Sequence, residues 1–158
     1  MKKTAVLLVL VFVLVSVVFV SGCEEKTPAE DVLTTSDDKP TIDLSVEPTS
    51  INLEDGETTD EFVTATLTRK DDNDFSAQIQ VRVKSSAPGY IFPVDVDGKT
   101  DMYFESKPLK GKNSQDIIQF KVFGDKGDFE TATGTLTLEM YWNNTKLKNT
   151  EEIEVSVE

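Results

Sequence analysis

The sequence predicts an all-β domain, a single antiparallel β-sandwich over residues 41–158, built from about seven to nine strands. Apolar residues recur at every second position from Thr41 onward, the period of a half-buried strand. Clusters of Asp, Asn, Gly and Pro interrupt this alternation about every 8–12 residues, as turns do. No stretch of that region carries an apolar stripe with the helical period of 3.6. A small β-barrel is the alternative architecture.

The first strands are expected on either side of Pro48 and before the turn clusters at 54–57 and 71–74. Their predicted inward residues are Ile42, Leu44 and Val46, then Ile51 and Leu53, then Val63, Ala65 and Leu67, with Thr64, Thr66 and Thr68 outward. The longest alternation predicts the next strand, with Phe75, Ala77, Ile79, Val81 and Val83 inward and Ser76, Gln78, Gln80, Arg82 and Lys84 outward.

The alternation is looser between residues 88 and 105. Short strands are expected over 90–96 and 102–105, around a turn at Asp97-Gly98, and Pro93 restricts the first of them to a sheet edge. The later inward positions are Ile118, Phe120 and Val122, then Leu136, Leu138, Met140 and Trp142, then Ile153, Val155 and Val157. A tight turn at Asn143-Asn144 should join the last two strands.

This number and spacing of strands is typical of immunoglobulin-like sandwiches, although the chain lacks the Cys pair and the early Trp of antibody domains. The stretch Val46-Glu-Pro-Thr-Ser-Ile-Asn-Leu-Glu-Asp-Gly-Glu-Thr58 resembles the opening of cell-adhesion-related (CARDB-type) and related domains of archaeal and bacterial exported proteins. Phe120-Lys121-Val122, after the turn at 108–112, fits the same domains. The resemblance covers most of 41–158. It implies an immunoglobulin-like fold and no shared catalytic residues.

The N-terminus has the pattern of an export signal. Lys2 and Lys3 precede an apolar run over 4–20, and the run ends in Val20-Ser21-Gly22-Cys23. These four residues resemble the lipobox of prokaryotic lipoproteins, which implies cleavage of a 1–22 signal peptide and lipidation of Cys23. Val at position 20, where Leu is commoner, fits an archaeal lipoprotein. Residues 23–40 are expected to form the lipidated Cys and a flexible acidic stalk, because they contain few apolar side chains.

The apolar run leaves one alternative open. It exceeds the usual signal core of about 7–15 residues and reaches the lower limit of a membrane span, about 17–25 residues. A retained span would make the protein a single-span β-sandwich component of a surface motility or secretion complex. Both interpretations place the domain at the outer face of the cytoplasmic membrane, on the cell surface.

Composition limits the chemistry. The chain has 16 basic and 29 acidic residues, a formal charge of −13, which disfavours nucleic acid as a partner. It has no histidine, and Cys23 is its only cysteine, so zinc, haem and iron–sulfur sites lack ligands and no internal disulfide can form. We therefore expect no enzyme activity and no cofactor other than the lipid on Cys23.

Two sequence motifs suggest binding or modification. Asp95, Asp97 and Asp101 are candidate ligands for weakly held calcium, although Gly98 is misplaced for an EF-hand and an Asp-Gly hairpin turn explains the pattern equally well. Asn143-Asn144-Thr145 is an N-glycosylation sequon, which makes Asn143 a candidate acceptor. The same two asparagines equally suit a tight turn.

Exposed aromatic residues suggest a glycan as a further candidate ligand. Tyr141 is out of phase with Trp142 and should face solvent, whereas the pattern leaves the facing of Tyr90 and Tyr103 open. The function expected first is non-enzymatic protein–protein interaction or adhesion at the cell envelope, with an envelope or surface-layer protein as partner and the 88–105 segment as contact region. A glycan- or calcium-binding module is the alternative.

Overall fold

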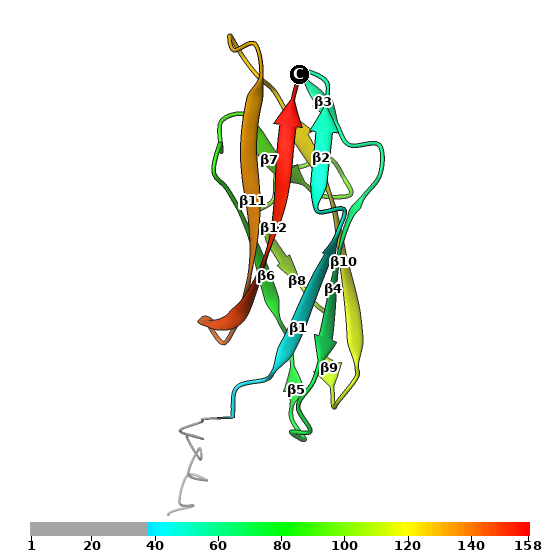
Figure 1. Ribbon diagram of the computed structural model, residues 1–158. Helices are drawn as coiled ribbons and strands as arrows, with labels where there is room; N and C mark the ends of the chain where they lie inside the picture. The colour runs from blue at the N-terminus through cyan, green and yellow to red at the C-terminus, as the bar shows by residue number, and fades with distance from the viewer. Residues whose placement is uncertain (1–37) are drawn as a thin grey trace, which may run out of the picture. The chain divides into compact units, whose positions relative to one another are not determined.

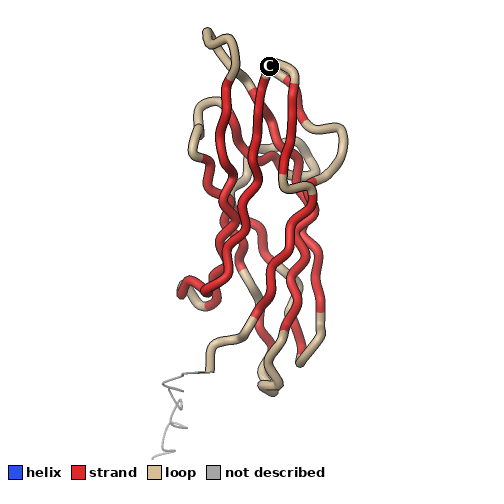
Figure 2. Tube along the Cα trace, viewed as in Figure 1, coloured by secondary structure: helices blue, strands red, loops and turns tan. Residues whose placement is uncertain are grey.

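Twelve β-strands make up the part of the chain that the computed structural model describes, residues 38–158 (Figure 1). Strands and loops alternate throughout this range (Figure 2). Within these residues no helix has the length and apolarity that a membrane crossing needs. The predicted signal peptide, Cys23 and most of the predicted stalk lie outside the described residues.

The first sheet is centred on β10. Its strands are β1 (Ile42–Glu47), β4 (Val63–Arg69), β10 (Gln115–Gly124), β3 (Glu57–Thr58) and β7 (Ile91–Val94). β1 pairs with β4, which pairs with β10, and the last part of β10 pairs with both β3 and β7. All of these pairs are antiparallel.

The second sheet packs against the first. In spatial order its strands are β2 (Ser50–Leu53), β12 (Thr145–Val157), β11 (Ala132–Trp142), β6 (Gln80–Ser85) and β8 (Tyr103–Glu105). The two remaining strands, β5 (Ser76–Ala77) and β9 (Leu109–Lys110), pair only with each other. Pro48, whose peptide bond is cis, lies between β1 and β2. β1 joins one sheet and β2 the other. The result is an immunoglobulin-like β-sandwich, as predicted.

The structure corrects three details of the prediction. It has twelve strands instead of seven to nine, and three of them (β3, β5 and β9) have only two residues each. The sheets are not purely antiparallel, because β2 runs parallel to β12. The strand predicted over 75–84 is broken at Gln78-Ile79, because its first part, β5, pairs with β9 and its second part, β6, pairs with β11. At the break Ile79 and Ser106 exchange hydrogen bonds, which satisfies the Ile79 backbone.

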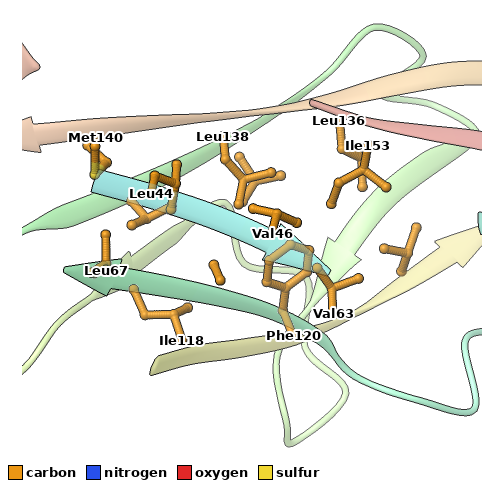
Figure 3. Packing of buried hydrophobic residues seen from close by; sticks show 14 of the residues in the cluster. Leu44, Val46, Val63, Leu67, Ile118, Phe120, Leu136, Leu138, Met140 and Ile153 are labelled. Atoms are coloured by element: carbon orange, nitrogen blue, oxygen red, sulfur yellow. The ribbon is translucent and has the colours of Figure 1, made fainter. Parts of the chain in front are cut away.

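The hydrophobic core lies between the two sheets (Figure 3). The predicted inward faces are confirmed: Leu67, Val81, Phe120, Leu138 and Ile153 are completely buried. Burial of each such side chain is worth about 1.5–3 kcal/mol relative to exposure. Phe75 and Trp142 are only half-buried and stack on each other at 5.4 Å between ring centroids. Pro93 lies in β7, which pairs with no named strand but β10 in the described domain, so its predicted edge position is confirmed.

One charged residue belongs to the interior. Arg69, the last residue of β4, is completely buried. Its guanidinium donates to the Asp71 carboxylate at 2.7 and 3.0 Å and to the backbone carbonyls of Phe75, Asn73 (2.9 Å) and Leu109 (3.0 Å). Burial acts to raise the pKa of Asp71, but the hydrogen bonds from Arg69 and from backbone N–H groups hold it below its usual value. Arg69 therefore ties the 70–75 turn to β9.

Candidate functional site

The outer face of the second sheet carries two tyrosines on either side of an arginine. The strand register places Tyr103 of β8 opposite Arg82 of β6, and Tyr141 of β11 opposite Gln80 of β6. The Arg82 guanidinium carbon lies 3.9 Å from the Tyr141 ring centroid and 5.5 Å from that of Tyr103. Tyr103 remains 56% exposed. We call these three residues the tyrosine face.

A buried carboxylate anchors this face. Glu139 on β11 is only 6% exposed and accepts hydrogen bonds from Lys146 and Lys84, both at 2.6 Å, and from the Tyr141 hydroxyl at 2.9 Å. The hydrogen bonds from Lys146 and Lys84 outweigh burial and lower the pKa of Glu139 to about 2. The same contact raises the pKa of Lys84. Both shifts lead away from neutrality, so Glu139 and Lys84 position Tyr141 and are not poised to transfer a proton.

Beside Tyr141 the surface is hollowed. The hollow has a volume of about 210 Å³ and is lined by Gln78, Gln80, Glu105, Tyr141, Asn143 and Asn144. We call it the amide hollow, since four of its six residues carry primary amides. Arg82 donates to the Gln80 carbonyl oxygen at 2.7 Å, and the Gln78 amide donates to Glu105 at 3.2 Å.

A larger hollow of about 470 Å³ lies on the same sheet, over β2, β12 and β11. Six of its ten lining residues are Ser, Thr or Gly, and Glu154 is its one ionisable residue. Its lining residues are Ser50, Ile51, Asn52, Ser86, Thr133, Gly134, Thr135, Glu154, Val155 and Ser156. No aromatic ring lines it, so it offers less for ligand recognition than the amide hollow.

Other aromatic residues lie away from the tyrosine face. Tyr90, 38% exposed, packs edge-on against Phe129 at 5.7 Å between centroids. On β7 and β10, Phe92 and Phe123 stack at 4.9 Å. None of these four aromatic residues lines either hollow, in contrast to Tyr141.

Two of the three candidate calcium residues, Asp95 and Asp101, cap backbone N–H groups of turns. The Asp95 carboxylate accepts hydrogen bonds from the backbone N–H of Asp97 at 2.9 Å and of Lys99 at 2.8 Å. Asp101 accepts from the N–H of Tyr103 at 2.9 Å. Across the described domain, no group of three or more acidic, His or Cys side chains is arranged to hold a metal ion. A hairpin turn accounts for this arrangement, and calcium binding stays an untested prediction.

The glycosylation candidate occupies an exposed hairpin turn. Asn143 and Asn144 have φ values of 46° and 60°, the left-handed conformation that a two-residue type I′ turn requires. The predicted tight turn between β11 and β12 is thus confirmed, and Asn143 is solvent-exposed. Modification of Asn143 remains a prediction. Cys23 and the cleavage motif Val20, Ser21 and Gly22 lie outside the described residues.

Sequence reasoning did not single out the two charged residues that organise the structure. Arg69 was detectable, because it continues the inward series of Val63, Ala65 and Leu67 and so requires a buried partner. Glu139 was not, because it falls on an outward position of its strand. Its burial depends on cross-strand neighbours that only the register defines.

Comparisons with known proteins identify fold-level resemblances. No family profile and no curated protein matches the chain. Similar solved structures include the CARDB domain of a Pyrococcus furiosus protein in complex with di-metal ions, at 13% identity and a TM-score of 0.47, covering 78% of this chain and 97% of that one. They also include domains 4 and 5 of the S-layer protein SbsC, at 17% identity and a TM-score of 0.36, covering 75% of this chain and 46% of that structure.

The CooA pilin subunit from enterotoxigenic Escherichia coli is a third similar structure, at 12% identity and a TM-score of 0.42, covering 75% of this chain and 97% of that one. All three identities are below 25% and all three TM-scores below 0.5. We therefore base the fold assignment on the strand topology itself and infer neither family nor activity from these likenesses.

Proposed function

We propose that this protein is a surface lipoprotein, anchored through Cys23, whose immunoglobulin-like domain mediates non-enzymatic protein–protein interaction at the cell envelope. The sequence supports the anchor through the lipobox-like Val20-Ser21-Gly22-Cys23. Two acyl or ether chains on one cysteine would give stable attachment. The described domain begins at the end that holds β5 and β9 and finishes at the opposite end (Figure 1).

The observation that most directly supports an interaction role is the path of the 88–105 segment. It contributes β7 to one sheet and β8 to the other, and in the described domain each is paired with a named strand on one side only. Such edges can accept a strand from a partner through backbone hydrogen bonds. Val96, between them, is 66% exposed, so its side chain is accessible to a partner.

The pKa shifts of Glu139, Asp71 and Lys84 do not suit these groups to acid–base catalysis. The resolved pKa shifts of Glu139 and Asp71 are downward, and that of Lys84 is upward. These shifts lead away from neutrality, whereas a general acid or base requires a pKa near the working pH.

Mass spectrometry of the membrane-extracted protein tests the anchor. We expect a chain that begins at lipidated Cys23, and a Cys23→Ala variant that keeps Met1 because processing is blocked. A wild-type chain with an intact Met1 would overturn the lipoprotein assignment. It would favour the single-span alternative instead.

Photo-cross-linking in intact cells tests the interaction surface. A photoreactive amino acid at Val96 should capture a discrete envelope protein. The same probe at Ile117, which is 57% exposed on β10 and lies outside the 88–105 segment, is the matched control. Equal capture from both positions, or none from Val96, would exclude the 88–105 segment as the contact region.

A further inference from the structure

The amide hollow has the chemistry of a carbohydrate site. Each primary amide offers two N–H donors and a carbonyl acceptor at fixed angles. Gln78, Gln80, Asn143 and Asn144 bring four such groups around one ring, that of Tyr141. Vicinal sugar hydroxyls need donors and acceptors side by side, and the apolar C–H face of a pyranose packs against an aromatic ring. Apart from Tyr141 no large apolar side chain lines the hollow, which disfavours a protein hot spot.

The aromatic wall of this hollow is held in place before any ligand arrives. The Tyr141 hydroxyl donates to Glu139 at 2.9 Å, and the Arg82 guanidinium lies 3.9 Å from the ring centroid. Arg82 is itself fixed by its hydrogen bond to Gln80. Binding here would therefore cost little side-chain entropy at the ring.

We propose that the amide hollow binds a neutral saccharide, with one pyranose ring against Tyr141 and its hydroxyls hydrogen-bonded by Gln78, Gln80 and Asn144. The volume of about 210 Å³ is below the roughly 300–1,000 Å³ of pockets that enclose drug-sized ligands, so it suits one ring of a longer chain. Tyr103, exposed beyond Arg82, offers a second ring for the continuing chain.

The charged residues at the hollow and the net charge of the chain favour a neutral saccharide over an acidic one. Glu105 lines the hollow, and the whole chain carries a formal charge of −13. Lys84, a nearby basic residue of β6, is ion-paired with Glu139, and Arg82 donates one hydrogen bond from its Nε to the side-chain amide of Gln80. A uronic acid would therefore bring its carboxylate close to that of Glu105, on a chain whose net charge is negative.

This site goes beyond the interaction role and does not require the lipid anchor or the 88–105 contact. It also bears on Asn143, because a glycan on that side chain would start at the rim of the hollow. The test accordingly uses full-length protein in detergent micelles, produced in a host without N-glycosylation. Failure of either proposal would leave the other standing.

The experiment is a glycan array of neutral and acidic oligosaccharides, followed by ligand-observed NMR titration of the strongest neutral binder. We expect neutral chains to bind and oligogalacturonate not to. Asn144→Gly keeps the type I′ turn and removes one amide, and Gln78→Ala removes another; each should weaken binding about three- to tenfold. Gln119→Ala, on the outer face of the other sheet, should leave binding unchanged.

Three results would overturn the proposal. One is the absence of any neutral binder, and another is a preference for acidic chains. The third is a neutral binder whose affinity is the same in the wild type, Asn144→Gly and Gln78→Ala. Neither substitution touches the core, so each variant should remain folded and report on the site itself.

Discussion

Replacement of Arg69 by methionine should destabilise the domain more than any surface charge substitution. The side chain is completely buried, and methionine can fill a similar volume without its charge. The change leaves the Asp71 carboxylate, whose side chain is 13% exposed, without its cation. It also removes the donor to the carbonyls of Phe75, Asn73 and Leu109.

The expected magnitude follows from these contacts. Removal of one partner of a buried ion pair costs about 3–5 kcal/mol, and each buried carbonyl left unpaired adds to that cost unless water reaches it. Partial exposure of Asp71 keeps the total near this range. We therefore expect Arg69→Met to lower the free energy of unfolding by about 3–5 kcal/mol.

Urea unfolding of the full-length chain in detergent micelles measures this loss. Trp142 is the only tryptophan and stacks on Phe75, which lies under Arg69 at 4.7 Å, so its fluorescence reports on this part of the core. With a slope of about 2 kcal/mol/M, the midpoint should fall by about 1.5–2.5 M.

A neighbouring ion pair provides the control. Lys70 and Asp43 approach to 3.2 Å, with side chains 45% and 58% exposed, so Lys70→Met should cost less than about 1 kcal/mol. A loss below about 1 kcal/mol for Arg69→Met would refute the reasoning that this guanidinium supports the turn. Arg69→Lys keeps the charge and loses the planar guanidinium, so its loss of unfolding free energy should lie between those of Lys70→Met and Arg69→Met.

Three further outcomes are expected. Because the folded-state pKa of Glu139 is about 2 against an ordinary 4.5, its stabilisation is present above about pH 4.5 and is lost as the pH falls toward 2. Glu139→Gln should thus lower the free energy of unfolding by about 1–3 kcal/mol at pH 7, a figure that allows for the half-exposure of the two lysine partners, and by almost nothing at pH 2. Urea midpoints at the two pH values measure these losses, and an equal loss at both would contradict the prediction. Gly124→Ala should cost about 1–3 kcal/mol in thermal unfolding, because its Cβ would lie 2.6 Å from Val157, whereas Gly89→Ala meets nothing within 4 Å and should be near neutral. In the native host, Asn143→Gln should remove a glycan-dependent shift in gel mobility, and unchanged mobility with intact glycosylation of other proteins would argue against modification.

Several strands and their inward faces could be predicted because they depend on local pattern. The alternation of Val63, Ala65 and Leu67 with threonines defines a two-sided strand wherever its partner lies. The turn at Asn143-Asn144 likewise follows from the tolerance of asparagine for positive φ. The break at Gln78-Ile79 could not be predicted, because alternation continues through it and only the change of partner strand interrupts the pairing.

The candidate site, too, could be predicted only in part from local sequence pattern. Outward positions for Arg82, Lys84 and Tyr141 follow from the sequence alone, since side chains on a strand alternate. The contacts between these side chains depend on β6 and β11 being neighbours in one particular register. This register brings Glu139 to two lysines and brings Tyr141 into one hollow with glutamines that lie some sixty residues earlier. A shift of one residue would turn every one of these side chains to the opposite face.

The sequence by itself therefore determined the fold class, the core-facing residues and the limits that charge and the absence of histidine place on chemistry, because these depend on composition and on a period of two. Only the tertiary structure decided which outward side chains meet. Long-range pairing brings together residues whose separation along the chain carries no local signal, and it is this pairing that builds the tyrosine face and the amide hollow.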